Sequence, residues 1–121
     1  MILGVVSGEM PEEGAIWNLE GVELEKAKLA GANLAGANLE NARLTFTKLE
    51  NVNLEGANLT GANLMSAYLE GANLKGAKLE GAKLEGAKLK DAILIDVNLE
   101  GVNMDGVNLI GTYRYVSPYV S

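Results

Sequence analysis

The sequence predicts an all-β solenoid, in which the chain winds into four-sided coils that stack along one axis. Three observations carry this prediction. Every fifth residue from Leu19 to Leu109 is leucine, with Met104 as the single exception. The residue two places before each of these positions is almost always alanine or valine. The spacing runs without an insertion, and strict repetition of a short unit is typical of repeat architectures.

A period of five fits neither regular element. Five residues of α-helix advance about 140° beyond a full turn, so successive leucines would spiral around the helix without forming an apolar stripe. On a flat strand, an odd period would send successive leucines to opposite faces. If each unit contains its own corner, however, every leucine faces inward. About four corners close a loop, which makes a coil of roughly 20 residues, and coils can stack about 4.8 Å apart.

The same geometry predicts the core. Leucine and the small residue two places earlier share a side, because strand side chains alternate, and both point inward. The expected core members include Leu39, Leu59, Leu64, Leu79 and Leu99. Glycine often follows two places after leucine, where a corner needs unusual backbone angles. The 19 repeat positions make about 4.75 coils, a stack roughly 23 Å long.

The repeats divide the chain into three parts. Residues 1–16 are expected to form an N-terminal tail or cap, residues 17–112 the β-helix, and residues 113–121 a C-terminal cap or tail. Open ends of a stack need capping because their strand edges are unpaired. We interpret Trp17, in an inward position, as part of the N-terminal cap, with a binding aromatic as the alternative. Arg114 stands where the next leucine is due.

At this point the units resemble the pentapeptide repeat proteins, whose motif is A-[D/N]-L-x-x. The resemblance covers most of the chain and implies a right-handed quadrilateral β-helix; the period itself does not determine the handedness. The residue before leucine is often asparagine but never aspartate, and in several units it is basic. The basic residues at this position are Lys28, Arg43, Lys48, Lys78, Lys83 and Lys88.

The composition argues against an enzyme. The chain has no cysteine and no histidine, so thiolate metal sites and the commonest general base are excluded. We expect no catalytic, cofactor or metal site. The formal net charge of −6 argues mildly against direct binding of nucleic acid. The sequence shows neither a convincing signal peptide nor a membrane span, and we therefore expect a cytoplasmic protein.

The outward positions offer two candidate surfaces. A 20-residue coil would stack Glu20, Glu40, Glu80 and Glu100 into an acidic row on one side, interrupted by Thr60. Outward apolar side chains are expected near the C-terminal end, where they are candidates for protein contact. These candidate contact residues are Ile93, Ile95, Tyr113, Tyr115 and Tyr119. Three interpretations stay open: the tail folds back over the isoleucines, the surface self-associates, or it binds a different protein.

Phe46 occupies a corner where small residues are usual. It either packs on a neighbouring corner or is exposed, and the sequence leaves both interpretations open.

Two hypotheses for the function follow. The first is a non-catalytic protein–protein interaction or scaffold module with an unidentified protein partner, or a homodimer formed through the C-terminal end. The alternative comes from the resemblance: some pentapeptide repeat proteins mimic DNA and bind type II topoisomerases such as DNA gyrase, which can protect against quinolones. The regular units are compatible with a whole protein, an excised domain or a consensus-like sequence.

Overall fold

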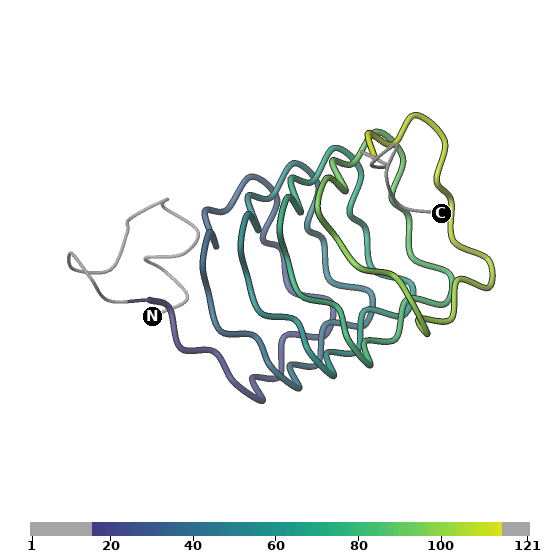
Figure 1. Ribbon diagram of the computed structural model, residues 1–121. Coiled ribbons are helices and arrows are strands. Elements are labelled where there is room, and N and C mark those ends of the chain that lie inside the picture. The colour runs from purple at the N-terminus through teal and green to yellow at the C-terminus, as the bar shows by residue number, and fades with distance from the viewer. Residues whose placement is uncertain (1–15, 115–121) are drawn as a thin grey trace.

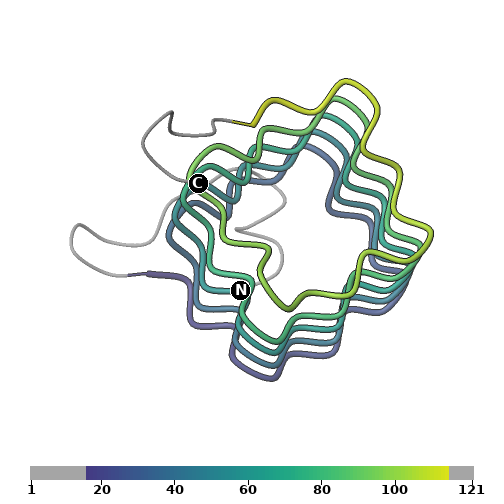
Figure 2. The same ribbon diagram turned by 45° about the vertical axis from the view of Figure 1, so that its right-hand side comes forward.

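The chain winds into a stack of four-sided coils (Figures 1 and 2), seen in a computed structural model that describes residues 16–114. This part of the chain contains no helix and no strand longer than one residue. Its sides are instead joined by isolated parallel bridges between residues 20 apart, such as Asn18–Asn38, Lys28–Lys48 and Asn53–Asn73. This register agrees with the predicted coil, and it makes the fold a quadrilateral β-helix.

Each five-residue unit forms its own corner by a hydrogen-bonded turn. In a typical unit the N–H of Ala57 donates to the C=O of Leu54 at 3.0 Å. The corner residue between them, Gly56, has a φ of 68°, in the left-handed region that glycine adopts without strain. A turn closed in this way, with a positive φ at its third residue, is a type II turn. The turn explains why glycine recurs two places after leucine.

Up to residue 78, neighbouring coils are held together by backbone hydrogen bonds on each side of the stack. The N–H of Leu59 donates to the C=O of Lys78 at 2.8 Å, and the N–H of Gly61 donates to the C=O of Glu80 at 2.9 Å. In the reverse direction, the N–H of Lys78 donates to the C=O of Ala57 at 2.9 Å. Most interior backbone groups are therefore paired without any long strand.

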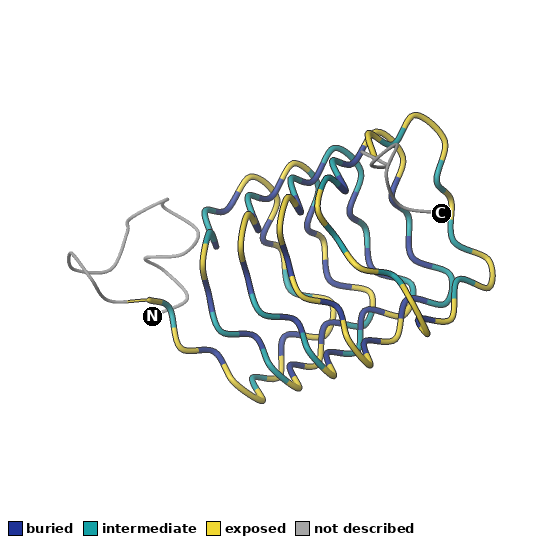
Figure 3. Cartoon of the chain, in the orientation of Figure 1, coloured by how far each residue is buried: buried dark blue, intermediate teal, exposed yellow. Residues whose placement is uncertain are grey.

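The buried residues of the stack are mostly leucine and alanine. Figure 3 shows buried residues recurring along the coils, between exposed corners. Leu39, Leu59, Leu64 and Leu79 are each at most 1% exposed, whereas Leu99 is only partly buried. Thr47 is the one buried polar residue among residues 16–114. Its hydroxyl donates to the C=O of Leu24 at 2.7 Å, which satisfies the polar group.

Asparagine before leucine has a structural role in the turn. The side-chain Oδ1 of Asn58 accepts a hydrogen bond from the N–H of Thr60 at 3.0 Å. This N–H lies on the outward side of the corner and has no partner in the backbone ladder. The same bond recurs where asparagine precedes leucine, for example at Asn38, Asn63, Asn73, Asn98 and Asn108. Lysine at this position cannot accept such a bond.

We expect Asn58→Ala to lower the free energy of unfolding by about 0.5–1.5 kcal/mol, because it removes one hydrogen bond to the turn. Urea unfolding measures the change. Lys78→Ala is the matched control, since Lys78 stands in the same position one coil later and makes no such bond. Equal losses in the two variants would show that the asparagine bond adds nothing to stability.

Candidate interaction surface at the carboxyl-terminal end

The last coil departs from the stack on two of its sides. The 20-residue register would pair Lys78 with Asn98 and Lys83 with Asn103, but neither bridge forms. Within residues 16–114, the N–H groups of Leu79, Gly81 and Leu84 find no backbone acceptor. Pairing resumes at Lys88–Asn108 and Ile93–Tyr113. In Figure 1 this coil, at the yellow end of the chain, stands apart from the one before it.

The unpaired amides that face the last coil should exchange their hydrogens quickly. We expect Leu79, Gly81 and Leu84 to be less protected than Leu59, Gly61 and Leu64 by about a factor of ten or more, because a missing hydrogen bond removes the need for local opening. Hydrogen exchange followed by nuclear magnetic resonance measures each amide separately. Comparable protection in the two sets would mean that the last coil closes onto the stack in solution.

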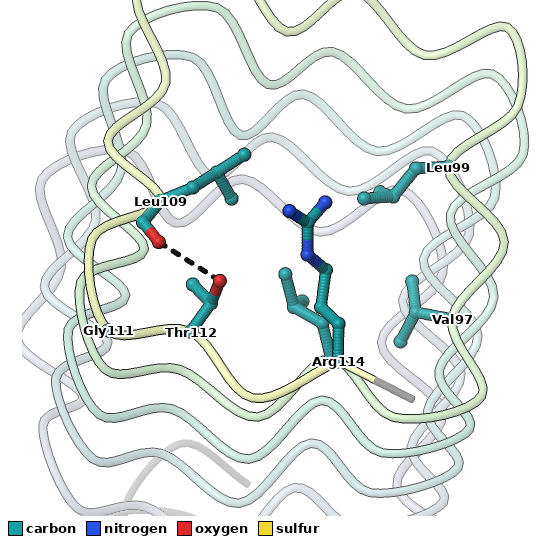
Figure 4. A pocket seen from close by; sticks show the side chains of 7 residues that line it. Val97, Leu99, Leu109, Gly111, Thr112 and Arg114 are labelled. Atoms are coloured by element: carbon teal, nitrogen blue, oxygen red, sulfur yellow. Dashed lines mark hydrogen bonds between the residues drawn. The ribbon is translucent and has the colours of Figure 1, made fainter. Parts of the chain in front are cut away.

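The carboxyl-terminal end of the core is open. A cavity of about 700 Å³ lies inside the last coil. Its lining consists of Leu94, Val97, Leu99, Leu109, Gly111, Thr112 and Arg114. Figure 4 shows the side chain of Arg114 reaching over this opening between Leu109 and Leu99, and the hydroxyl of Thr112 donates to the C=O of Leu109 at 3.0 Å. A guanidinium cannot be buried alone among leucines, so Arg114 ends the leucine core.

The predicted contact residues fall into three groups. Ile93 and Ile95 are half-buried, and Ile93 pairs with Tyr113 in the next coil. Tyr113 itself is 63% exposed. Tyr115 and Tyr119 lie outside the described residues.

Most of the predicted N-terminal cap also lies outside the described residues. Trp17, the part of it that the structure describes, packs partly buried against the core.

Ile110 is a contact candidate that the sequence analysis missed. It is 68% exposed, more than any other large apolar side chain among the described residues. The sequence contains the information needed to find it: Ile110 follows Leu109 directly and therefore takes an outward position in its unit. Ile110 and Tyr113 place exposed apolar side chains on the coil that encloses the open cavity.

The acidic row is shorter than its spacing suggests. Glu20, Glu40 and Glu80 follow residues that are bridged in one continuous column, from Asn18 through Asn38 and Asn58 to Lys78. Glu100 lies instead in the segment that leaves the stack. Lys78 also stands two residues before Glu80 in the same five-residue unit. The charge on this side is therefore mixed.

The described residues show little that could support chemistry. Residues 16–114 contain no group of three or more acidic, histidine or cysteine side chains placed to hold a metal ion. Arg43 and Glu23 form an ion pair with their charged atoms 3.6 Å apart, and both side chains are exposed to solvent. No helix in this part of the chain has the length and apolar character needed to cross a membrane.

Comparisons with known proteins agree with this architecture. A family model described as pentapeptide repeats, in eight copies, matches residues 18–56, 47–86 and 82–113. The pentapeptide repeat protein Rfr23 from the cyanobacterium Cyanothece 51142 is 41% identical over 81% of this chain and 60% of its own, with a TM-score of 0.47. A pentapeptide repeat protein from Nostoc PCC 7120 is 26% identical over 69% of this chain and 84% of its own, with a TM-score of 0.63.

A third solved structure is HetL from Nostoc sp. PCC 7120, a pentapeptide repeat protein involved in the regulation of heterocyst differentiation. It is 29% identical over 79% of this chain and 54% of its own, with a TM-score of 0.49. This chain thus spans about three fifths of the length of Rfr23 and about half that of HetL. No curated protein matches the sequence.

Proposed function

Because this chain belongs to the pentapeptide repeat family, we propose that it is a non-catalytic protein–protein interaction or scaffold module. Its contact surface is the carboxyl-terminal end of the stack. The partner is a second protein, or a second copy of this chain joined through the same end. The finer features of the proposed fold are right-handed winding, which the family resemblance implies, and about 4.75 coils, which follows from four units per coil.

The observation that carries this proposal is the open end of the core. Elsewhere the stack buries its leucines almost completely, whereas Leu99 and Leu109 are only partly buried and line the cavity. Ile110 and Tyr113 expose large apolar surfaces on the same coil. Exposed apolar side chains beside an incompletely covered core are typical of a surface that another polypeptide covers.

The first experiment measures the absolute mass in solution by light scattering after size exclusion, at low and at high salt. A salt-resistant dimer that Tyr113→Glu dissociates supports self-association through this end. If the wild type is a monomer, the protein is immobilised and cross-linked to proteins in a lysate of its source cells. Proteins retained by the wild type are expected to be lost with Ile110→Glu and Tyr113→Glu combined.

Thr60→Glu is the matched control for this experiment, because Thr60 lies in the middle of the stack, 40 residues and therefore two coils before Glu100 of the last coil. It should leave both the mass and the retained proteins unchanged. A monomer that retains the same proteins with or without the substitutions at Ile110 and Tyr113 would contradict the proposed surface.

DNA mimicry of a type II topoisomerase substrate has weaker support. It requires a long and strongly negative surface, and the acidic row supplies Glu20, Glu40 and Glu80 in register. Five lysines, however, lie between residues 75 and 90: Lys75, Lys78, Lys83, Lys88 and Lys90. A DNA gyrase supercoiling assay separates the two hypotheses, since the interaction module leaves supercoiling unchanged even in large excess.

A further inference from the structure

Residues 96–104 form a strap that is anchored to the stack at both ends but leaves it in between (Figure 1). Just before the strap, the C=O of Ile95 accepts a hydrogen bond from the N–H of Gly76 at 2.9 Å. Just after it, the C=O of Asp105 accepts one from the N–H of Gly86 at 2.9 Å. Within the part of the chain that the structure describes, no backbone hydrogen bond joins the strap itself to the preceding coil.

The strap has the length that closure onto the preceding coil requires. At both anchors the donor and the acceptor are 19 residues apart, the same offset as in the bond from the N–H of Gly61 to the C=O of Glu80 in the regular stack. No residue is therefore missing or inserted between the anchors. Residues 76–84, the equivalent segment one coil earlier, make five backbone hydrogen bonds with the coil before them. The strap has the same number of residues and can make the same five bonds.

The strap already has the local conformation of a regular coil. The N–H of Val102 donates to the C=O of Leu99 at 3.1 Å, which closes a turn, and the N–H of Glu100 donates to Oδ1 of Asn98 at 2.9 Å. Valine in the inward slot is compatible with a closed coil, because Val52 fills this slot in the regular stack and is 0% exposed. Closure therefore requires the strap to move as a unit and does not require it to refold.

The coil that faces the strap has unused backbone partners, which favour closure. Ala77 and Ala82 are 3% and 5% exposed, and neither C=O accepts a backbone hydrogen bond from the described residues. A carbonyl that is shielded from water and lacks a partner costs free energy. The N–H groups of Leu79 and Leu84 are unpaired on the same edge.

Two effects oppose closure and keep the open state populated. Fixing the nine residues of the strap costs conformational entropy, and a terminal coil gains contacts on one side only. The 20-residue register would also stack Glu100 on Glu80, and like charges directly opposite each other are destabilising.

We propose that the strap is a lid, open in the more populated state, that closes onto residues 78–84 in the 20-residue register. Closure places Leu99 over Leu79 and Met104 over Leu84, and it covers two side chains that are only partly buried in the open state. The lid thereby sets how much apolar surface this end of the core exposes. The movement belongs to the chain itself and does not rest on the contact surface proposed above.

Two engineered cysteine pairs test the movement, because the chain has no cysteine of its own. Lys78→Cys with Asn98→Cys can form a disulfide within one chain only when the lid is closed. Lys78→Cys with Asn58→Cys is the matched control, since Asn58 and Lys78 are bridged in the structure. Coils about 4.8 Å apart place paired Cα atoms within the range of about 4.4–6.8 Å that a disulfide allows. Each pair also removes one asparagine bond to a turn.

Both variants are oxidised mildly, and the disulfide within one chain is followed by mass spectrometry of unreduced peptides. The control pair should cross-link quickly. The lid pair should also cross-link completely, but at least about tenfold more slowly, as a closed state populated at about a tenth or less requires. After cross-linking, the amides of Gly81 and Leu84 should exchange their hydrogens at least about tenfold more slowly than before oxidation.

Three results would overturn the proposal. A lid pair that never cross-links, while the control pair does, means that the strap does not reach the preceding coil. A lid pair that cross-links as fast as the control means that no separate open state exists. Unchanged exchange at Gly81 and Leu84 after cross-linking means that the strap does not close as a unit.

Discussion

Leu64→Ala is expected to lower the free energy of unfolding by about 2–5 kcal/mol, the range for removing a buried leucine side chain. Leu64 is 0% exposed and lies near the middle of the stack, with Leu44 and Leu84 in the coils on either side. The backbone around it is fixed by hydrogen bonds, including that from the N–H of Leu64 to the C=O of Lys83 at 2.8 Å. The coils cannot collapse into the space, so a cavity remains.

Urea unfolding followed by circular dichroism measures this loss. Leu109→Ala is the matched control, because Leu109 holds the same position in its unit but lines the open end of the core. Its removal leaves no enclosed cavity, and the loss should be clearly smaller. If Leu64→Ala unfolded at the same urea concentration as the wild type, the inward leucine column could not be the main source of stability.

The regular part of the fold could be predicted from the sequence because residues within each five-residue unit determine its turn and its inward side. A leucine, a small residue two places before it and a glycine two places after it specify one inward side and one turn. The structure buries every repeat leucine from Leu19 to Leu94, and no long-range information was needed to place them. The asparagine bond to the turn is equally local, and it persists at Asn98, where the coil has left the stack.

The departures from regularity could not be predicted in this way, because they depend on neighbours. The units of Leu99 and Met104 keep the spacing of those before them, with methionine in place of leucine at 104, yet both side chains are only partly buried. A terminal repeat has a neighbour on one side only and loses the burial and hydrogen bonds of the other. The exposure of Phe46 likewise depends on what the adjacent coil places beside it, which is Met65. Periodicity identifies the outward positions but not how far each is covered.

Ala62→Phe is expected to prevent folding or to lower the free energy of unfolding by at least about 3 kcal/mol, at or beyond the upper end of the usual cost of overpacking. Ala62 is 0% exposed, and the small residues Ala42 and Ala82 occupy the same inward slot in the coils on either side. These coils cannot move apart to admit a ring. The N–H of Asn63 donates to the C=O of Ala42, and the N–H of Lys83 donates to the C=O of Ala62, both at 2.9 Å.

Ala62→Val provides the matched control for this prediction, measured by the yield of folded protein and by urea unfolding. Valine already fills an equivalent inward slot at Val52, which is 0% exposed in a regular part of the stack. Its extra volume should therefore cost near the lower end of the about 1–3 kcal/mol that added methylenes typically cost. If the phenylalanine variant were as stable as the valine variant, the coil interior would have to be wider than the leucine and alanine contacts allow. The small residue two places before leucine would then be a matter of turn geometry rather than of packing.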